Sequence, residues 1–356
     1  MHQRTRARIH AAMTGSEHQH SATLAPFGWS DFFEGQLGAE DAHLEPMRIA
    51  TVQRSRLGAL SVAGQVRLDL PAKASTADYA VGDWVLVEAD SLTCIRRLDR
   101  KSILQRRTEG GRAPQLIAAN VDTLFIVTSC NDDLNPARLE RYLALANQSG
   151  ALPVVVLTKA DQVDDTAPYL QQVVGLQRGL DVVALDARSP QAAMSLAPWL
   201  GAGQTVALVG SSGVGKSSLL NMLSAVSSAQ AQATGSIREG DAKGRHTTTS
   251  RSLHAIVGGA WVIDTPGMRS LQVSDATEGL EQLFAEITEL APQCRFRDCT
   301  HAHEPGCAVQ AAVNAGALDP ARLERWRKLD DENRTSTPVL TGQHGKKIPK
   351  YTGKRR

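Results

Sequence analysis

The eight residues from Gly210 to Ser217 constrain the fold of this chain more than any other segment. They read Gly-Ser-Ser-Gly-Val-Gly-Lys-Ser and match a phosphate-binding loop at every required position. An apolar run from Thr205 to Val209 precedes them, and a run that opens a helix at Ser218 follows. A strand, a glycine-rich turn and a helix N-terminus in this order let backbone N–H groups surround a phosphate. The segment therefore predicts an α/β domain with a phosphate loop.

We assign a role to each part of this loop. Lys216 is expected to reach the β and γ phosphates and to contribute to catalysis, and the Ser217 hydroxyl is expected to ligate Mg²⁺. The glycines allow the backbone to curl around the phosphates, and the helix N-terminus adds partial positive charge. The remaining predicted phosphate-binding residues are Gly210, Ser211, Ser212, Gly213, Val214, Gly215 and Ser218.

Two further segments have the composition of nucleotide-sensing loops. Asp264 ends an apolar strand that begins at Trp261, and the sequence continues to Gly267 as Asp-Thr-Pro-Gly. The acid suits a water-mediated Mg²⁺ contact, and the glycine suits a backbone N–H for the γ-phosphate. Between the phosphate loop and this motif lies the polar stretch Gly244–Thr249. One of its three threonine hydroxyls is expected to complete the Mg²⁺ shell, and we take Thr248; an exposed Thr-rich loop is the alternative.

A third motif is suited to reading a nucleotide base. The residues Thr158-Lys-Ala-Asp161 follow the apolar strand from Val154 to Leu157. A carboxylate at Asp161 can accept hydrogen bonds from both N1–H and N2–H₂ of guanine, whereas adenine offers no matching donor pair. The stem of Lys159 would cover the base. Thr158 stands where Asn is commonest, so one hydrogen bond on the base side is expected to be weaker; an ordinary strand-to-helix turn is the alternative.

The order of these motifs is itself informative. In Ras-like GTPases the phosphate loop comes first and the base-reading motif lies near the end. Here Thr158–Asp161 precedes Gly210–Ser217 by about fifty residues, and Asp264–Gly267 comes last. Because chain ends and permutation sites fall in surface loops, a parallel sheet tolerates this order. The sequence therefore predicts a circularly permuted GTPase domain.

The rest of the chain divides around this domain. Its 356 residues suffice for two or three domains, and its 42% hydrophobic residues are typical of globular proteins. Short alternating runs between turn residues predict a small β-barrel, after which strand and helix alternate as in a parallel sheet covered on both faces. The expected divisions are a loosely packed N-terminal extension at 1–45, the barrel at 46–112, the GTPase domain at 113–290, a metal-binding domain at 291–335 and a basic tail at 336–356.

A compact group of potential metal ligands lies near the C-terminus. Cys294, Cys299, His301 and Cys307 fall within fourteen residues and form a Cys₃His set suited to tetrahedral Zn²⁺. Four protein ligands leave no open position, so one structural zinc ion per chain is expected. His303 is a rival ligand, and free thiols on a surface loop are the other alternative.

Charge and apolar runs constrain the partners and the compartment. Lys and Arg number 39 against 37 Asp and Glu, but the first ten and the last fourteen residues carry basic charges and no acid. Such ends suggest contact with a polyanion, and solvated ends are the alternative. The five Cys fit no disulfide framework, and the longest apolar runs are too short to span a membrane. We therefore expect a protein of the reducing cytoplasm that has no membrane partner.

Together these motifs resemble ribosome small subunit-dependent GTPase A, a family of circularly permuted bacterial GTPases of ribosome assembly. The resemblance extends from about residue 47 to residue 333. Besides the motifs described above, the segments that carry it are Val81–Val85, Ile117–Asp122 and Glu304–Cys307.

The resemblance implies a fold, a set of partners and a reaction. The fold is multidomain, with an N-terminal OB-fold barrel that binds RNA, a central circularly permuted P-loop GTPase domain and a C-terminal zinc-binding domain with helices. The partners are the small ribosomal subunit and its 16S-type rRNA late in assembly, and the protein is expected to be a monomer. GTP hydrolysis to GDP would be stimulated by that subunit and coupled to maturation or factor release. Basic residues also flank the barrel's end and could meet rRNA phosphates; a solvated charged surface is the alternative. They are Arg96, Arg97, Arg100, Lys101, Arg106, Arg107 and Arg112.

A second position, besides Thr158, departs from ordinary GTPases. Met268 stands where Ras-like enzymes carry the Gln that positions the attacking water, and a thioether cannot orient water. We therefore take His246 as the candidate catalytic residue and expect slow intrinsic turnover, no faster than the ~10⁻⁴ s⁻¹ of an unassisted small GTPase. Met268 leaves a non-catalytic, nucleotide-stabilised RNA-binding scaffold as an alternative function. An ATP-dependent kinase or a different phosphate-loop enzyme is a third possibility, against which Asp161 and the Asp264–Gly267 motif argue.

Overall fold

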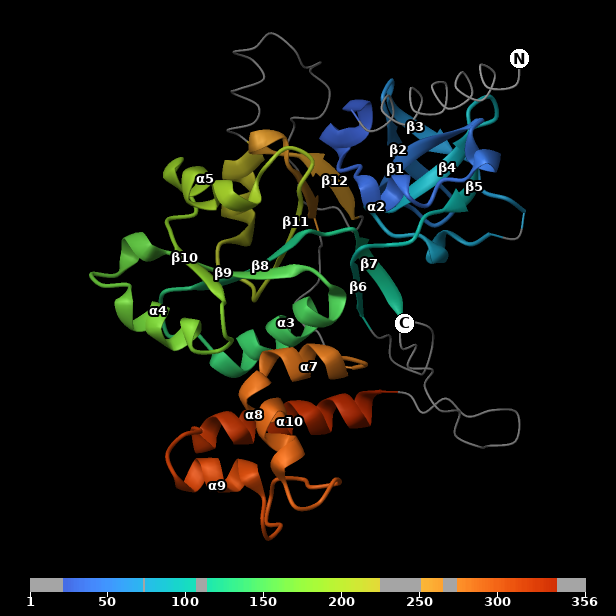
Figure 1. Cartoon of the computed structure of the whole chain (residues 1–356). Coiled ribbons are helices and arrows are strands. Elements are labelled where there is room, and N and C mark those ends of the chain that lie inside the picture. Colours follow the sequence, from blue (N-terminus) through green and yellow to red (C-terminus); the bar gives the residue numbers. More distant parts are fainter. Residues whose placement is uncertain (1–21, 73, 107–113, 225–250, 265–273, 338–356) are drawn as a thin grey trace, which may run out of the picture.

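The structure, a computed structural model, describes residues 22–72, 74–106, 114–224, 251–264 and 274–337. A β-barrel, a central sheet covered by helices and a C-terminal group of helices follow one another along the molecule (Figure 1). In the described part of the chain, no helix is both long enough and apolar enough to cross a membrane.

A parallel sheet forms the centre of the molecule. Its strands lie in the order β10-β9-β8-β11-β13 and are all parallel, and β12 pairs antiparallel with β13 on the side that faces the barrel. The parallel sheet predicted from the alternation of strands and helices is therefore present. The strands are β8 (Thr123–Ser129), β9 (Leu152–Thr158), β10 (Asp181–Ala184), β11 (Thr205–Val209), β12 (Ser252–Ala255) and β13 (Trp261–Asp264).

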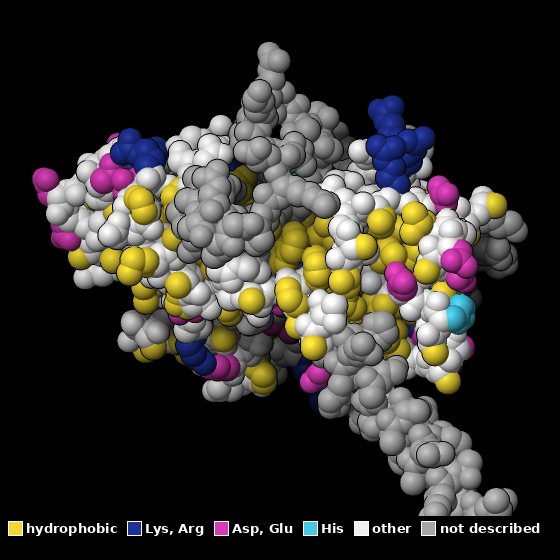
Figure 2. Space-filling model, turned by 90° about the horizontal axis from the view of Figure 1, so that it is seen from above, with side chains coloured by type: hydrophobic (Ala, Val, Ile, Leu, Met, Phe, Trp, Pro, Cys, Tyr) yellow, Lys and Arg dark blue, Asp and Glu magenta, His cyan; other side chains and the backbone are white. Residues whose placement is uncertain are grey.

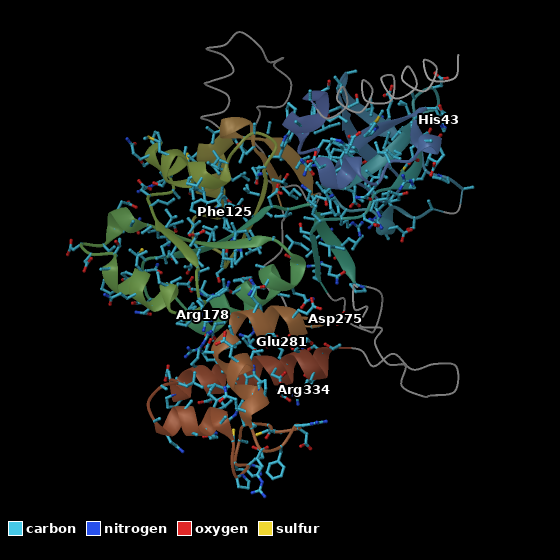
Figure 3. The ribbon with its side chains drawn as sticks, viewed as in Figure 1. His43, Phe125, Arg178, Asp275, Glu281 and Arg334 are labelled. Carbon is cyan, nitrogen blue, oxygen red and sulfur yellow. The ribbon has the colours of Figure 1, made fainter. Side chains whose placement is uncertain are left out.

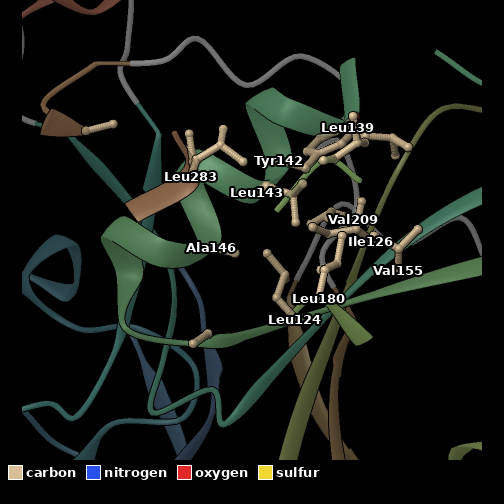
Figure 4. Packing of buried hydrophobic residues seen from close by; sticks show 14 of the residues in the cluster. Leu124, Ile126, Leu139, Tyr142, Leu143, Ala146, Val155, Leu180, Val209 and Leu283 are labelled. Carbon is tan, nitrogen blue, oxygen red and sulfur yellow. The ribbon is translucent and has the colours of Figure 1, made fainter. Parts of the chain in front are cut away.

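Helices cover both faces of this sheet. Successive side chains of a strand point to opposite faces, so Leu124 and Ile126 pack with Val209 against α3 (Figure 4), whereas Phe125 and Val127 pack against α5 and the helix after β11. Both clusters are fully buried, which explains why these strands read as continuous apolar runs. The helices are α3 (Pro136–Ser149), α4 (Ala167–Val174), α5 (Gln191–Leu196) and a helical segment at 216–224.

The barrel is built from the first five strands. They pair antiparallel in the order β3-β2-β1-β4-β5, and a bridge between Asp69 and Thr93 brings the two ends of this order together. A partly open five-stranded barrel is the architecture of the OB-fold. The strands are β1 (Leu44–Val52), β2 (Leu57–Ser61), β3 (Gly64–Leu68), β4 (Trp84–Glu88) and β5 (Thr93–Arg97), and a hairpin of β6 (Ile103–Arg106) and β7 (Gln115–Ala119) follows.

The described part of the N-terminal extension is packed, contrary to the loose packing expected for residues 1–45. Leu24, Trp29 and Phe33 are each at most 4% exposed and form a small core with Trp84 of β4. The ring centroids of Trp29 and Trp84 lie 4.8 Å apart in an edge-to-face arrangement. The short helix α2 (Asp31–Glu34) carries Phe33 into this core. The sequence shows the aromatic residues but not their distant partner, so it does not reveal the packing.

Arg48 of β1 joins the N-terminal segment, the barrel and the central sheet. Its side chain is buried, and its guanidinium donates to the carbonyl of Phe27 at 2.5 Å and to Oγ1 of Thr205 at 2.6 Å. Burial lowers the pKa of Arg48 to about 10, so the group stays charged at neutral pH. In addition, Thr51 of β1 pairs with Ser252 of β12. The barrel and the sheet are therefore directly connected by backbone and side-chain contacts.

A buried ionic cluster joins the C-terminal helices to the central sheet. Glu140 of α3 is fully buried and accepts from Arg322 at 2.6 Å and from Arg325 at 2.9 Å. Arg322 also donates to Glu286 and to the carbonyl of Leu283, both at 2.8 Å. Every charge in the cluster is thus paired, as burial requires. The C-terminal helices are α7 (Thr277–Leu283), α8 (Ala285–Leu290), α9 (Ala308–Asn314) and α10 (Pro320–Ser336).

Arg322→Met is expected to lower the free energy of unfolding by about 2–3 kcal/mol. The loss is below the ~3–5 kcal/mol of a fully uncompensated buried charge, because Arg325 still pairs with Glu140. Urea denaturation followed by circular dichroism would measure it. The matched control is Arg334→Met, since Arg334 (labelled in Figure 3) is on the same helix but pairs with Asp330 at the surface, where a change within about 0.5 kcal/mol is expected. Equal losses in the two variants would contradict the prediction.

Candidate nucleotide and metal sites

The predicted phosphate loop and the predicted base-reading motif emerge at the same edge of the sheet. The phosphate loop follows β11, and Thr158–Asp161 follows β9. Both strands are parallel to β8 and lie on its two sides. Because the carboxyl ends of parallel strands share one edge, the two motifs become neighbours although about fifty residues separate them in sequence. Ligands of open α/β sheets bind at such an edge.

Glycine is required at the start of the phosphate loop. Gly210 has φ of 143°, and a side-chain Cβ there would come within 2.1 Å of the carbonyl oxygen of Val127 in β8. Gly213 and Gly215 have φ of 82° and 92°, in the left-handed region that other residues rarely adopt. A Cβ on Gly213 would meet nothing within 4 Å, so conformation and not space demands glycine there. The loop's path is therefore fixed by its own sequence and by contact with β8.

The polar groups of the loop are placed for an anion. The ammonium of Lys216 donates to the carbonyl oxygens of Gly210, at 2.8 Å, and Ser211. Ser217 and Ser218 are exposed at the start of the helix at 216–224, where free backbone N–H groups and the helix dipole favour negative charge. Thus the ammonium of Lys216, the Ser217 hydroxyl that is predicted to ligate Mg²⁺ and the helix N-terminus lie side by side in one short segment.

Thr158 connects the two motifs. Its side chain is fully buried, and its Oγ1 lies 2.5 Å from the carbonyl oxygen of Val214 in the phosphate loop and 3.0 Å from that of Thr128 in β8. The single hydroxyl proton therefore faces two backbone acceptors. A Cβ on Gly215 would also lie only 3.2 Å from this oxygen. Sequence reasoning considered Thr158 only as part of base recognition, because its contact to the loop depends on the strand order.

Asp161 has a charged partner that sequence reasoning missed. The Nη2 of Arg188 lies 2.7 Å from Oδ2 of Asp161, and Nε of Arg188 lies 3.4 Å from Oδ1 of Asp186. Arg188 belongs to the loop after β10, the strand beside β9. Lys159 adopts a left-handed backbone conformation with φ of 58°, which turns the chain at the end of β9. The sequence Arg188-Ser-Pro after the short strand β10 does not by itself indicate that Arg188 pairs with Asp161.

Of the residues predicted for the nucleotide-sensing loops, the structure describes Asp264 alone. Asp264 is the last residue of β13 and pairs by its backbone with Ser252 of β12. The remaining predicted positions, Gly267, Met268, His246 and Thr248, lie outside the described residues.

The predicted metal ligands come together in space. One ligand atom from each of Cys294, Cys299, His301 and Cys307 lies within 4.8 Å of the others, so the group could hold a metal ion. The sulfurs of Cys294 and Cys307 are 3.8 Å apart, and Nδ1 of His301 is 3.5 Å and 3.4 Å from them. His303, the rival ligand, is exposed and outside this group.

The backbone around His301 supports its orientation. His301 has φ of 59°, and its carbonyl accepts from Gln310 at 2.6 Å and from Arg327 of α10. Its ring lies 5.4 Å from that of Trp326, centroid to centroid. Burial lowers the pKa of His301, so the imidazole is neutral at pH 7 and its Nδ1 lone pair is available to a metal. The contacts of His301 with Gln310, Arg327 and Trp326 therefore hold this predicted ligand in place.

Some of the basic residues expected to meet RNA have partners within the protein. Arg96 pairs with Asp41 at 2.5 Å, and Arg100 makes two bonds to the fully buried Asp83, at 2.6 and 2.7 Å. On the face in Figure 2, Lys and Arg side chains stand in separate groups with acidic side chains among them. Hence Arg96 and Arg100 have structural roles. Arg107 and Arg112 lie outside the described residues.

The sequence is similar to known proteins over most of its length. The family model described as RsgA GTPase matches residues 97–274, half of the chain. The protein named small ribosomal subunit biogenesis GTPase RsgA of Mesorhizobium japonicum is 65% identical over 336 residues, which cover 94% of this chain and 97% of that protein. The protein named small ribosomal subunit biogenesis GTPase RsgA 2 of Vibrio vulnificus is 46% identical over 326 residues, or 91% and 92% of the two chains.

Two solved structures share the fold. YloQ, described as a circularly permuted GTPase, superimposes with a TM-score of 0.58 and 25% identity over 85% of this chain and all of that one. YjeQ from Thermotoga maritima superimposes with a TM-score of 0.60 and 24% identity over 81% and 98% of the two chains. The permuted order of motifs predicted from the sequence is thus confirmed.

His301→Ala is expected to abolish binding of the metal ion at the Cys₃His group, whereas His303→Ala is expected to retain one ion per chain. The two residues are two positions apart, but only His301 directs a nitrogen to the thiols. Metal content per chain, measured by mass spectrometry of the purified proteins, tests this directly. If the His301→Ala protein kept its metal ion and the His303→Ala protein lost it, His303 and not His301 would be the ligand.

Thr158→Val is expected to weaken GDP binding about fivefold or more. Removing the hydroxyl takes away the one proton that the buried carbonyls of Val214 and Thr128 share, at a cost of about 1–3 kcal/mol. Calorimetric titration with GDP measures the change. Thr166→Val is the control, because Thr166 precedes α4 and makes no side-chain capping hydrogen bond. Unchanged affinity in Thr158→Val would show that the hydroxyl does not stabilise the loop.

Proposed function

Because this chain belongs to the RsgA GTPase family, we propose that it is a GTPase of small ribosomal subunit assembly. It would bind the small subunit and its 16S-type rRNA late in assembly and couple GTP hydrolysis to maturation or release. The small subunit would stimulate hydrolysis. The scaffold alternative is not favoured, since the relatives are named as GTPases.

One observation carries this proposal: the phosphate loop and Asp161, whose carboxylate is suited to guanine, lie at the same edge of the parallel sheet in a circularly permuted domain. Thr158 ties the two together by its contact to Val214. Asp161 would accept N1–H and N2–H₂ of guanine, and Lys159 would cover the base. An ATP-dependent kinase would have no use for a carboxylate at this position, because adenine lacks that pair of donors.

The chain's own residues would bind and orient the substrate. Lys216 would exchange its carbonyl partners for the β and γ phosphates, and the amides of the loop would surround them. Ser217 would hold Mg²⁺, with Thr248 and, through water, Asp264; Mg²⁺ would neutralise charge on the phosphates. Gly267 would donate its N–H to the γ-phosphate. His246 would orient the attacking water in place of the Gln that Met268 replaces.

The Cys₃His group would bind one structural Zn²⁺. With Zn–S near 2.3 Å and Zn–N near 2.0 Å, a tetrahedral ion places two sulfurs about 3.8 Å apart and sulfur and nitrogen about 3.5 Å apart. The separations of 3.8, 3.5 and 3.4 Å between Cys294, Cys307 and His301 fit these values. Zinc would organise a loop that has little apolar core.

The remaining assignments follow from this role. The barrel at 46–112 would bind rRNA on a barrel face, the sheet at 113–290 would bind GTP and GDP, and the zinc domain would span 291–335. The extension at 1–45 and the basic tail at 336–356 would add contacts to rRNA. We further propose that the protein acts as a monomer in the cytoplasm, where ribosomal subunits assemble.

GTP hydrolysis should rise strongly with purified small ribosomal subunits and not with large subunits. The reason is that the chain lacks the water-positioning Gln, so the assembled complex would supply catalytic help. Phosphate release under steady-state conditions measures the rate, and ATP at an equal concentration should leave that rate unchanged. His246→Ala should lose the stimulated rate and keep GDP affinity. Tight GTP binding without stimulation by the small subunit would contradict the proposal.

A further inference from the structure

The carboxylate that would read guanine is already occupied by a side chain of the same domain. Nη2 of Arg188 lies 2.7 Å from Oδ2 of Asp161. A guanidinium presents planar N–H donors to a carboxylate, as the N1–H and N2–H₂ edge of guanine does. Arg188 and guanine therefore offer the same kind of donor to one acceptor group.

Contacts within its own loop orient Arg188 toward Asp161. Oδ1 of Asp186 accepts from the backbone N–H of Arg188 at 2.9 Å and lies 3.4 Å from its Nε. The loop is in turn held beside the base-reading motif, because the N–H of Leu185 donates to Leu157 and the N–H of Ala160 donates to Leu185. Asp186 thus directs the guanidinium toward Asp161 before any ligand arrives.

We propose that Arg188 competes with guanine for Asp161, so that the ion pair between them must open before the base can be read. This inference rests on the proposed reading of guanine by Asp161. Through this competition Arg188 lowers the affinity for guanine nucleotides without contacting the phosphates or the reacting atoms. Its side chain is 67% exposed, so it can leave Asp161 by rotating into solvent.

The competition has a definite kinetic signature. If the pair opens and closes quickly, only the open fraction can bind guanine, and the apparent affinity falls by that fraction. Exposed ion pairs of this kind have modest stability, which corresponds to a reduction of about two- to fivefold. The reduction falls on the association rate constant, because bound protein no longer contains the pair. Dissociation should be unaffected.

Arg188→Ala should therefore bind GDP about two- to fivefold faster than wild type, with an unchanged dissociation rate constant. Stopped-flow measurements with ribose-labelled fluorescent GDP and ADP provide both constants. Removing a cation near a polyanionic ligand ordinarily slows association, and labelled ADP reports that general effect. The expected result is a rise in the ratio of the GDP to the ADP association rate constants. Arg188→Lys keeps a cation that can pair with Asp161 and should stay near wild type.

A matched control separates local competition from net charge. Arg178, labelled in Figure 3, is a similarly exposed arginine that pairs with Glu289, away from Asp161. Arg178→Ala should leave the ratio of GDP to ADP association rate constants unchanged. An unchanged or lower ratio in Arg188→Ala would overturn the proposal, and so would faster GDP dissociation, which would mean that Arg188 holds Asp161 for the base.

Asp161→Asn distinguishes failure of this inference from failure of the proposed function. An amide at this position donates to the second carbonyl of xanthine and cannot accept two donors from guanine, so the variant should prefer XDP to GDP. If it binds both as wild type does, Asp161 does not read the base, and both proposals fail. If it switches preference while Arg188→Ala leaves GDP association unchanged, only the competition by Arg188 is wrong.

Discussion

The position of β8 between β9 and β11 is the constraint on which the candidate chemistry depends. Every residue of β8 is buried, and the strand pairs in parallel with both neighbours. This pairing brings the phosphate loop and the base-reading motif to one edge. The carbonyl of Val127 in β8 also excludes any side chain at Gly210, and that of Thr128 lies 3.0 Å from Oγ1 of Thr158. Strand order and loop conformation therefore support one another.

The contacts of Arg48 connect the barrel to the same central sheet. Arg48 reaches Thr205, the first residue of β11, and Trp261, the first residue of β13, donates its indole N–H to Pro26 at 2.8 Å. The N-terminal segment and the barrel thus contact the starts of two strands whose far ends lead to the phosphate loop and the Asp264 motif. A buried charge needs hydrogen-bond partners, because burying it without them would be costly.

The C-terminal helices are joined to the sheet in a different way. Glu140 and Arg322 form a buried ionic contact, while the Cys₃His group lies in a loop that contacts the same helix, α10, through Arg327. The sequence predicted the four ligands from residue type and spacing, because metal coordination needs few residues within a short segment. It did not predict the ionic cluster, because nothing in the spacing of Glu140 and Arg322, 182 positions apart, indicates that they meet.

The sequence by itself determined the features whose physics is local. The phosphate loop, the apolar strands, the Cys₃His set and the permuted order of motifs can all be read from short segments, since turns, helix starts and ligand spacing depend on neighbours in the chain. The tertiary structure alone decided that Thr158 braces the phosphate loop, that Arg188 occupies Asp161, and that the N-terminal aromatic residues pack on Trp84. These contacts join residues that the chain separates, and strand order, which residue spacing does not encode, determines which of them become neighbours.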